Sequence, residues 1–376
     1  LMPWNNPELA MQPTEQAHTI FGKSHLETCT LAQGLSLQFQ NAATAIETLD
    51  DELPDDKKMA AVSDMHRQYV YYLVLHEMGH TLGLMHNMKA TQMLSPAQMN
   101  DVALTQKIGL MGSVMDYPLV NISSDRSKQG DYYTTKCGPY DLWVIEYGYK
   151  PFSAAEEKAG LQKILARSTE YGHDFGNDAD DMRGSNSGVD PRVNIYDNTN
   201  DMVAYGEDRF KLINTMMPKL KDRYSKEGNS YQLLRSRYGQ LQSQRAQVAA
   251  ALSRYIGGVQ VDRSFVGQPT SAKPYTPVPA DYQKKAMALL GKYIFAPNAF
   301  DTDAYLLPYL QVQKRGFSNS EDFKPQAFAN TLHMTALSHL LHPNTLTRIN
   351  NSSLYGNSYS CADVMNDLVK NIMSAD

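Results

Sequence analysis

The most regular hydrophobic pattern in the sequence runs from about residue 59 to residue 84, a stretch that no proline interrupts. Ala61, Met65, Tyr69 and Leu73 recur there at four-residue spacing, as on one face of an α-helix. Residues 69–75 are apolar on every side, which is typical of a helix buried in the centre of a domain. We therefore predict one long, central helix over this stretch.

Helical patterns continue along the rest of the chain, most strongly in its second half. Between residues 231 and 255, apolar residues alternate at three- and four-residue spacing, which predicts a helix of about seven turns capped by Ser230. A short strand is predicted over residues 259–265, followed by an extended proline-rich connector. Further helices are predicted over residues 138–149, 282–295, 326–341 and 361–373, the last of them behind a Ser360/Asp363 capping box.

The composition is that of a globular protein. Of its 376 residues, 42% are hydrophobic, which gives room for a sizeable core and two domains. A net charge of -5 and the lack of a basic run argue against nucleic acid as a partner.

No apolar stretch is long enough to span a membrane. Leu1 opens no signal peptide, so we expect the natural chain to continue upstream. Cys29, Cys137 and Cys361 are compatible with one disulfide or with three thiols.

The strongest chemical signal lies at the end of the predicted central helix, where residues 76–86 read H-E-M-G-H-T-L-G-L-M-H. On a helix, His76 and His80 are one turn apart, so both imidazoles project from one face toward a single metal ion. Glu77 stands one step round, beside the metal's open position. Gly83 permits the sharp turn at which the helix ends, and that turn can bring His86 back as a third ligand.

Three neutral imidazoles with an open fourth position are the ligand set of a catalytic zinc site. Glu77 can then act as general base toward a water molecule at that position and pass the proton to a leaving amine. The pattern therefore predicts hydrolysis of a peptide bond. A structural zinc is the alternative, but such sites usually have four protein ligands, often cysteines, and no cysteine lies nearby in the sequence.

The extended motif resembles the signature of the metzincin clan of zinc metallopeptidases, H-E-x-x-H-x-x-G-x-x-H followed by a Met-turn. Residues 113–117 look like that Met-turn, which implies that Met115 forms a hydrophobic floor beneath the zinc ligands; an ordinary core methionine is the alternative. Tyr117 resembles the tyrosine of the astacin-like and serralysin-like branches, which can ligate zinc and stabilise the transition state. Asp116 departs from the residue usual in those branches, and a tyrosine that only packs near the cleft stays an equal alternative.

Over most of its length the chain is similar to large bacterial extracytoplasmic metzincin-like proteins, on the strength of residues 74–87, 113–118 and 138–149 and the connector before Gln283. The resemblance implies a periplasmic or secreted protein of mainly α class, α+β at most, with a long active-site helix, a Met-turn and little sheet. Together with the helical patterns it implies three parts: a metzincin-like zinc catalytic region over residues 1–150, a linker or irregular segment over 151–200, and a mostly helical C-terminal domain over 201–376.

One part of the metzincin pattern is weak in this sequence. Catalytic domains of the clan place a twisted sheet before the active-site helix, and its edge strand aligns the substrate. Residues 1–58 show little period-2 alternation. We therefore predict that most of the sheet is missing or reduced to a short remnant, so that zinc could bind while peptide hydrolysis is weak.

Two further polar clusters offer weaker candidate sites. Asparagine and aspartate side chains within residues 177–181 could supply oxygen ligands to calcium, but they lack the order of a known calcium loop, and a solvated loop is favoured. His333, His339 and His342 lack an acidic partner that would complete a second zinc motif, so ordinary core or surface histidines are favoured.

The function predicted from the sequence is that of a zinc-dependent metalloendopeptidase acting on a protein or peptide. His76, His80 and His86 are its expected zinc ligands, and Glu77 is its expected base. Two alternatives remain. One is a non-catalytic binding or scaffold protein that retains the zinc, and the other is a hydrolase of a non-protein amide or ester.

Overall fold

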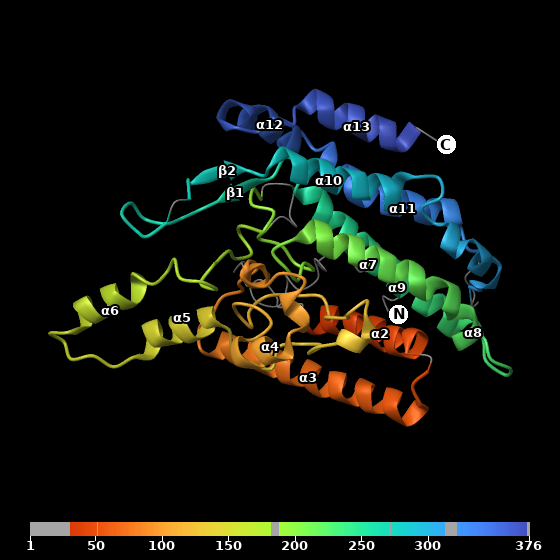
Figure 1. The fold of residues 1–376 in the computed structure, drawn as a ribbon, viewed down its shortest axis with the longest axis horizontal. Coiled ribbons are helices and arrows are strands. Elements are labelled where there is room, and N and C mark those ends of the chain that lie inside the picture. Colours follow the sequence, from red (N-terminus) through yellow and green to blue (C-terminus); the bar gives the residue numbers. More distant parts are fainter. Residues whose placement is uncertain (1–30, 51, 182–187, 271, 313–321, 374–376) are drawn as a thin grey trace, which may run out of the picture.

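The computed structural model of the chain describes residues 31–50, 52–181, 188–270, 272–312 and 322–373. Within them the fold is a stack of helices, which confirms the mainly α class (Figure 1). The stack begins with α3 (Asp55–Thr81) at one edge and continues through α2 (Leu31–Leu49) to α7 (Met202–Met216) and α9 (Gln232–Arg254). Beyond these lie α10 (Ala280–Leu290), α11 (Pro325–Leu340), α12 (Pro343–Ser352) and α13 (Cys361–Met373).

Shorter elements connect the long helices. The remaining α-helices are α4 (Val102–Ile108), α5 (Pro139–Tyr149), α6 (Glu157–Leu165) and α8 (Leu220–Tyr224). The short helical turns are η3 (Ala90–Met93), η4 (Gln98–Asn100), η5 (Arg126–Lys128), η6 (Met217–Lys219), η7 (Gly291–Phe295), η8 (Asp301–Tyr309) and η9 (Ser353–Tyr355), of which η7 is a π-helical turn that continues α10. The strands β1 (Val259–Val261) and β2 (Tyr275–Pro277) form one antiparallel pair, with Val259 opposite Pro277.

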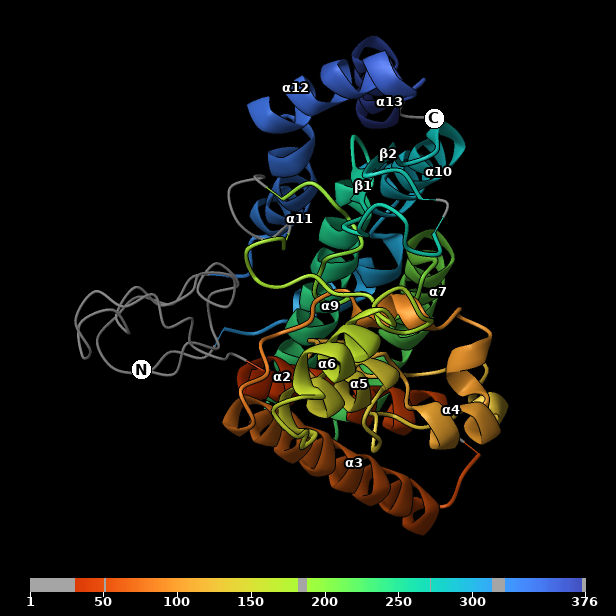
Figure 2. The same cartoon turned by 90° about the vertical axis from the view of Figure 1, so that its left-hand side faces the viewer.

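Helix α3 forms where the hydrophobic pattern predicts it, but its position differs from the prediction. It lies at the periphery in both views (Figures 1 and 2). Tyr72 is fully buried, whereas Tyr71 and Val74 on the outer face are each 50% exposed. The prediction of a central helix, buried on all sides, is therefore wrong. An apolar composition shows which side chains can be buried, but it does not show which faces have a partner.

Most helices of the second half form close to their predicted bounds. Helix α9 covers nearly all of residues 231–255, and α13 begins and ends at the predicted residues. The capping box that opens α13 is present: Asp363 N donates to Ser360 Oγ at 3.1 Å, and Ser360 N donates to Asp363 Oδ2 at 3.3 Å. The strand predicted over residues 259–265 is shorter, because the chain leaves the β1–β2 pair after Val261.

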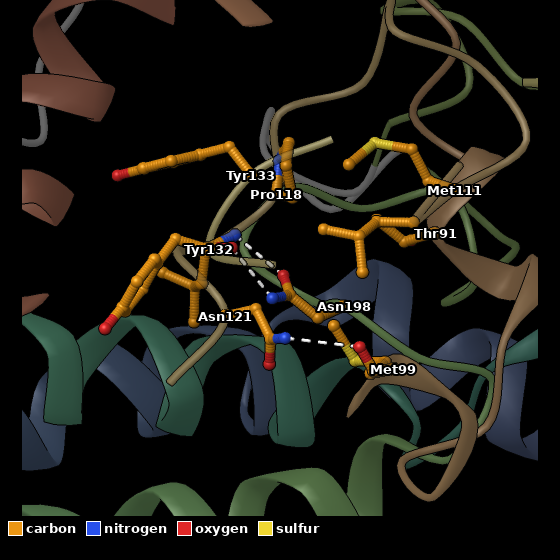
Figure 3. A pocket seen from close by; sticks show the side chains of 10 residues that line it. Thr91, Met99, Met111, Pro118, Asn121, Tyr132, Tyr133 and Asn198 are labelled. Carbon is orange, nitrogen blue, oxygen red and sulfur yellow. Dashed lines mark hydrogen bonds between the residues drawn. The ribbon is translucent and has the colours of Figure 1, made fainter. Parts of the chain in front are cut away.

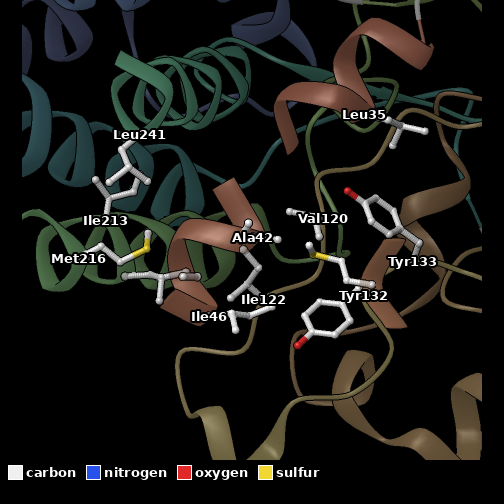
Figure 4. Close-up of a cluster of buried hydrophobic side chains, with 14 of the residues drawn as sticks. Leu35, Ala42, Ile46, Val120, Ile122, Tyr132, Tyr133, Ile213, Met216 and Leu241 are labelled. Atoms are coloured by element: carbon white, nitrogen blue, oxygen red, sulfur yellow. The ribbon is translucent and has the colours of Figure 1, made fainter. Parts of the chain in front are cut away.

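The largest buried hydrophobic cluster joins the two halves of the chain (Figure 4). It contains Leu35 and Ile46 of α2, Val120 and Tyr133 from the loops after α3, and Leu241 of α9. A second cluster lies among α7, α9, α10, α11 and α13. Because one cluster includes residues from both sides of the predicted linker over 151–200, the loops after α3 are packed directly on the C-terminal helices. The division at residues 150 and 200 stays a prediction.

Little of the described chain is strand. The β1–β2 pair is the only sheet within the described residues, and α2 is the only regular element that they contain before α3. The sheet remnant predicted ahead of α3 falls partly on residues 1–30, outside the described residues. Cys137 and Cys361 are free thiols, and Cys29 also lies outside the described residues.

Among the described helices, none combines the length and the apolar character required to cross a membrane.

Candidate metal centre

Three histidines come together at the C-terminal end of α3. His76 and His80 lie on its last two turns, and His86 follows in the loop beyond the helix. One ring nitrogen from each side chain lies within 4.8 Å of the other two. His76 and His86 are buried. The three candidate ligands predicted from the sequence therefore share one site that can hold a metal ion.

The turn at the end of α3 brings His86 back toward the helix. Gly83 has a φ of 83°, a left-handed conformation that glycine adopts without steric cost. Its N–H donates to His80 O, and Leu84 N donates to Gly79 O, each at 3.0 Å. These two bonds form a Schellman motif, which ends the helix and reverses the chain. The helix-ending role predicted for Gly83 thus has a defined backbone geometry.

Each of the three imidazoles is oriented by an acceptor on its Nδ1 atom. His76 Nδ1 donates to Val114 O at 2.8 Å, and His80 Nδ1 donates to Leu84 O at 3.1 Å. Because a carbonyl oxygen only accepts, these bonds place the proton on Nδ1 and leave the lone pair of Nε2 for a metal. His86 Nδ1 contacts a carboxylate instead, Asp178 Oδ2, at 2.6 Å.

The Nε2 side of the cluster fits a zinc ion. His80 Nε2 is buried and makes no hydrogen bond within the described residues, a costly arrangement for an imidazole nitrogen without a ligand. The Tyr117 hydroxyl lies 3.1 Å from His86 Nε2. Two ligands on one tetrahedral zinc are separated by about 3.3 Å, given metal–ligand distances of about 2.0 Å. The distance between the hydroxyl and His86 Nε2 is thus close to that between two ligands of one zinc ion, and the role of Tyr117 as a ligand or oxyanion donor stays a prediction.

Burial also keeps His76 in the form that binds metal. Burial, with smaller contributions from the neighbouring His80 and His86, lowers the pKa of His76 to about 3, against the raising effects of the bond to Val114 O and of the Asp178 carboxylate. A neutral imidazole is the metal-binding species. Glu77 follows His76 on α3 and is exposed, on the side of the helix that adjoins the open apolar face.

Met115 lies directly beneath the last turns of α3. Its side chain is fully buried, and a β-carbon placed on Gly79 would be 2.3 Å from its sulfur atom. The glycine between the two helical histidines is thus what allows Met115 to approach. The role of Met115 as a hydrophobic floor beneath the zinc ligands stays a prediction, and this contact places its sulfur against the helix between them.

Asp141 holds the turn that carries Met115. Its carboxylate accepts from Ser113 Oγ at 2.6 Å, from Val114 N at 2.9 Å and from Gly138 N at 2.8 Å. Ser113 Oγ in turn accepts from Met115 N at 3.0 Å. Since the Val114 carbonyl orients His76, Asp141 acts on both the methionine floor and one of the imidazoles.

Asp116, which departs from the residue usual in related metzincins, is buried behind the turn, where its carboxylate accepts hydrogen bonds from the backbone. Its carboxylate accepts from Tyr117 N at 2.7 Å and from Thr91 N at 3.0 Å, and its carbonyl accepts from the Tyr72 hydroxyl. Burial raises the pKa of Asp116, and the nearby Asp197, also fully buried, has its pKa raised for the same reason. Asp116 therefore ties the Met115 turn to the loop at Thr91, a packing role.

A family model described as Met-zincin matches residues 58–376, which is more than half of the chain. The chain belongs to the Met-zincin family. No curated protein and no solved structure matches this chain. The metzincin resemblance inferred from His76 to His86 and from the Met115 turn is thus confirmed. The match begins near the start of α3 and includes the whole C-terminal half of this Met-zincin chain.

Residues 177–181 differ from the solvated loop that the sequence favours. Asp178 reaches His86, and Asp181 is buried. Asp180 pairs with Arg263, which lies between β1 and β2. The acidic run signals only that polar side chains cluster there, and it does not show that a histidine 92 positions earlier lies beside them.

The histidines of the second half are core or surface residues, as predicted. His339 is buried, His333 packs between phenylalanines, and His342 caps α12.

A small internal cavity lies apart from the histidines (Figure 3). Its volume is about 10 Å³, enough for about one water molecule. Asn121 on its wall donates to Met99 O at 3.3 Å. None of the three histidines lines it, so this cavity is not a substrate site. An open hollow on the outer face of α3 is lined by Ser63, His66, Arg67, Val70, Tyr71 and Val74.

Proposed function

We propose that this Met-zincin protein is a zinc-dependent metalloendopeptidase that hydrolyses peptide bonds. The observation that carries the proposal is the orientation of His76, His80 and His86, whose Nδ1 atoms are all held by acceptors while one ring nitrogen of each lies within 4.8 Å of the other two. These three residues would hold the zinc ion. When bound, zinc supplies a Lewis acid that lowers the pKa of water and polarises the scissile carbonyl.

The remaining chemistry belongs to two side chains of the protein. Glu77 is the general base that takes a proton from the attacking water and returns it to the leaving amine. The Tyr117 hydroxyl, 3.1 Å from His86 Nε2, donates to the oxygen on which negative charge develops. Met115 and Gly79 keep the helical histidines in place from below. The substrate is a protein or peptide, and the family resemblance supports a periplasmic or secreted location.

A second candidate function is a zinc-retaining binding protein without hydrolytic activity. Two observations favour it: α3 exposes apolar side chains beside Glu77, and the described residues before α3 contain a helix and no strand. Without an edge strand to align it, a peptide would be held poorly for attack.

Metal analysis and one substitution separate the two candidates. Purified protein is expected to contain about one zinc ion per chain, and Glu77→Gln should keep that zinc while hydrolysis of casein or a peptide library is lost. Glu157→Gln, an equal change at an exposed position on α6, should leave both unchanged. Zinc without turnover in the unsubstituted protein would favour the binding protein. Turnover of esters or non-peptide amides alone would point to a different hydrolase.

A further inference from the structure

The third candidate ligand is oriented differently from the other two. His76 and His80 each donate to a backbone carbonyl, whereas His86 Nδ1 contacts the carboxylate of Asp178 at 2.6 Å. Both partners of this contact are largely buried, with side-chain exposures of 7% for His86 and 16% for Asp178. A charge-assisted hydrogen bond is stronger than one to a neutral carbonyl, and burial strengthens it further.

Asp178 is presented by a loop that is fastened next to His86. Met88 N donates to Gly176 O at 2.7 Å, and the Asn87 side chain bonds Gly176 N at 3.2 Å and Asp174 O at 2.9 Å. These bonds join the residues just after His86 to the residues just before Asp178. The carboxylate is therefore held beside the imidazole by the backbone on both sides.

The loop is also fixed on its far side. Asn177 closes a turn around Asp178, since its carbonyl accepts from Asp180 N at 2.9 Å and from Asp181 N at 3.1 Å. Asp180 then binds the guanidinium of Arg263 through two hydrogen bonds, at 2.8 and 2.5 Å. Because Arg263 lies between β1 and β2, the loop connects the C-terminal half of the chain to the metal centre.

We propose that Asp178 is a positioning residue for the metal centre. It fixes the ring of His86 in the orientation that directs Nε2 at the metal, holds the proton on Nδ1, and makes the imidazole a stronger ligand. Asp178 makes no contact with substrate in this role, since it acts only through His86. The inference rests on the zinc site of the proposed function. It adds to the three histidine ligands a residue that orients one of them, from a loop that the zinc motif does not include.

Zinc affinity is the quantity that tests this role. We compare the unsubstituted protein with Asp178→Asn and Asp178→Ala by chelator competition, and record the visible absorption of the cobalt-substituted proteins. Removal of a carboxylate partner from a metal-bound histidine typically weakens metal binding by about 10–100-fold. We expect that loss for Asp178→Ala and a smaller one for Asp178→Asn, whose amide oxygen can still accept from Nδ1. Asp125→Asn, at a carboxylate that contacts Ser127 and Lys128, should leave the affinity unchanged.

The outcomes separate this inference from the proposed function. If the unsubstituted protein binds no zinc, the proposed function fails. If it binds zinc and both Asp178 variants bind it equally well, with an unchanged cobalt spectrum, the positioning role is wrong. Circular dichroism and thermal unfolding of the zinc-free proteins show whether each variant is folded. Should Asp178→Ala fail to fold, the Asp178→Asn affinity decides.

Discussion

The sulfur atom of Met115 occupies the space that a side chain at Gly79 would need, at 2.3 Å from the position of its β-carbon. Glycine in the interior of a helix normally lowers stability by about 0.5–1 kcal/mol relative to alanine. At Gly79 the cost is offset by the contact that it allows, because Met115 can then pack fully buried beneath the turn that carries His76 and His80. The packing of Met115 therefore depends on glycine at position 79.

This contact predicts a reversal of sign between two backgrounds. Gly79→Ala should lower the free energy of unfolding of the zinc-free protein by about 1–2 kcal/mol, because the added methyl overpacks a filled site. In a Met115→Ala background, which is itself destabilised by about 2–5 kcal/mol, the same change should be neutral or stabilising. Urea unfolding measures all four proteins. Gly239→Ala, at a helical glycine with open space around it, should stabilise the protein by up to about 1 kcal/mol.

The anchor of the Met115 turn gives a second prediction. Asp141→Ala should lower the free energy of unfolding by about 3 kcal/mol, because it leaves three buried donors, from Ser113, Val114 and Gly138, without their acceptor. Zinc affinity should fall as well, since the Val114 carbonyl orients His76. Urea unfolding and chelator competition measure the two effects. A variant with native stability and native zinc affinity would refute the anchoring role.

The hydroxyl near His86 gives a third prediction. Tyr117→Phe keeps the buried ring but removes the oxygen 3.1 Å from His86 Nε2. Loss of one oxyanion donor typically lowers kcat by about 10²–10³-fold. We expect a decrease of that order with unchanged zinc content and little change in KM. Unchanged kcat would assign Tyr117 to packing alone, and lost zinc would make it a required ligand.

The sequence predicts the parts of this site that follow from local rules, and it misses those that depend on distant contacts. His76, His80 and Gly83 act within one helix and its terminal turn, so their spacing predicts their geometry. Asp141 follows a glycine and a proline at the start of α5, a helix-start signal that places it near the N-terminus of that helix but does not show what it binds. Asp178 lies 92 positions from its partner, and no periodicity reports such a contact. The exposed face of α3 was missed because periodicity describes a helix and not its neighbours.

The buried histidine of α11 predicts an acid-sensitive fold that is independent of the metal. Burial, with added repulsion from Arg254 and Arg348, lowers the pKa of His339 to about 3, below its usual value of 6.5. The unfolded chain therefore binds a proton at this residue between pH 6.5 and 3 while the folded chain does not. The stability that neutral His339 contributes is complete above pH 6.5 and is lost as the pH falls toward 3, at about 1.4 kcal/mol per pH unit.

Replacement of the titrating ring isolates this effect. His339→Gln should make the free energy of unfolding less dependent on pH between 6.5 and 3, so the variant gains on the unsubstituted protein as the pH falls. Urea unfolding at several pH values, with a chelator present so that zinc release does not contribute, measures the difference. His333→Gln, a partly exposed histidine on the same helix, serves as the matched control. Parallel pH profiles for His339→Gln and the unsubstituted protein would show that His339 is not protonated on unfolding in this range, contrary to the burial argument.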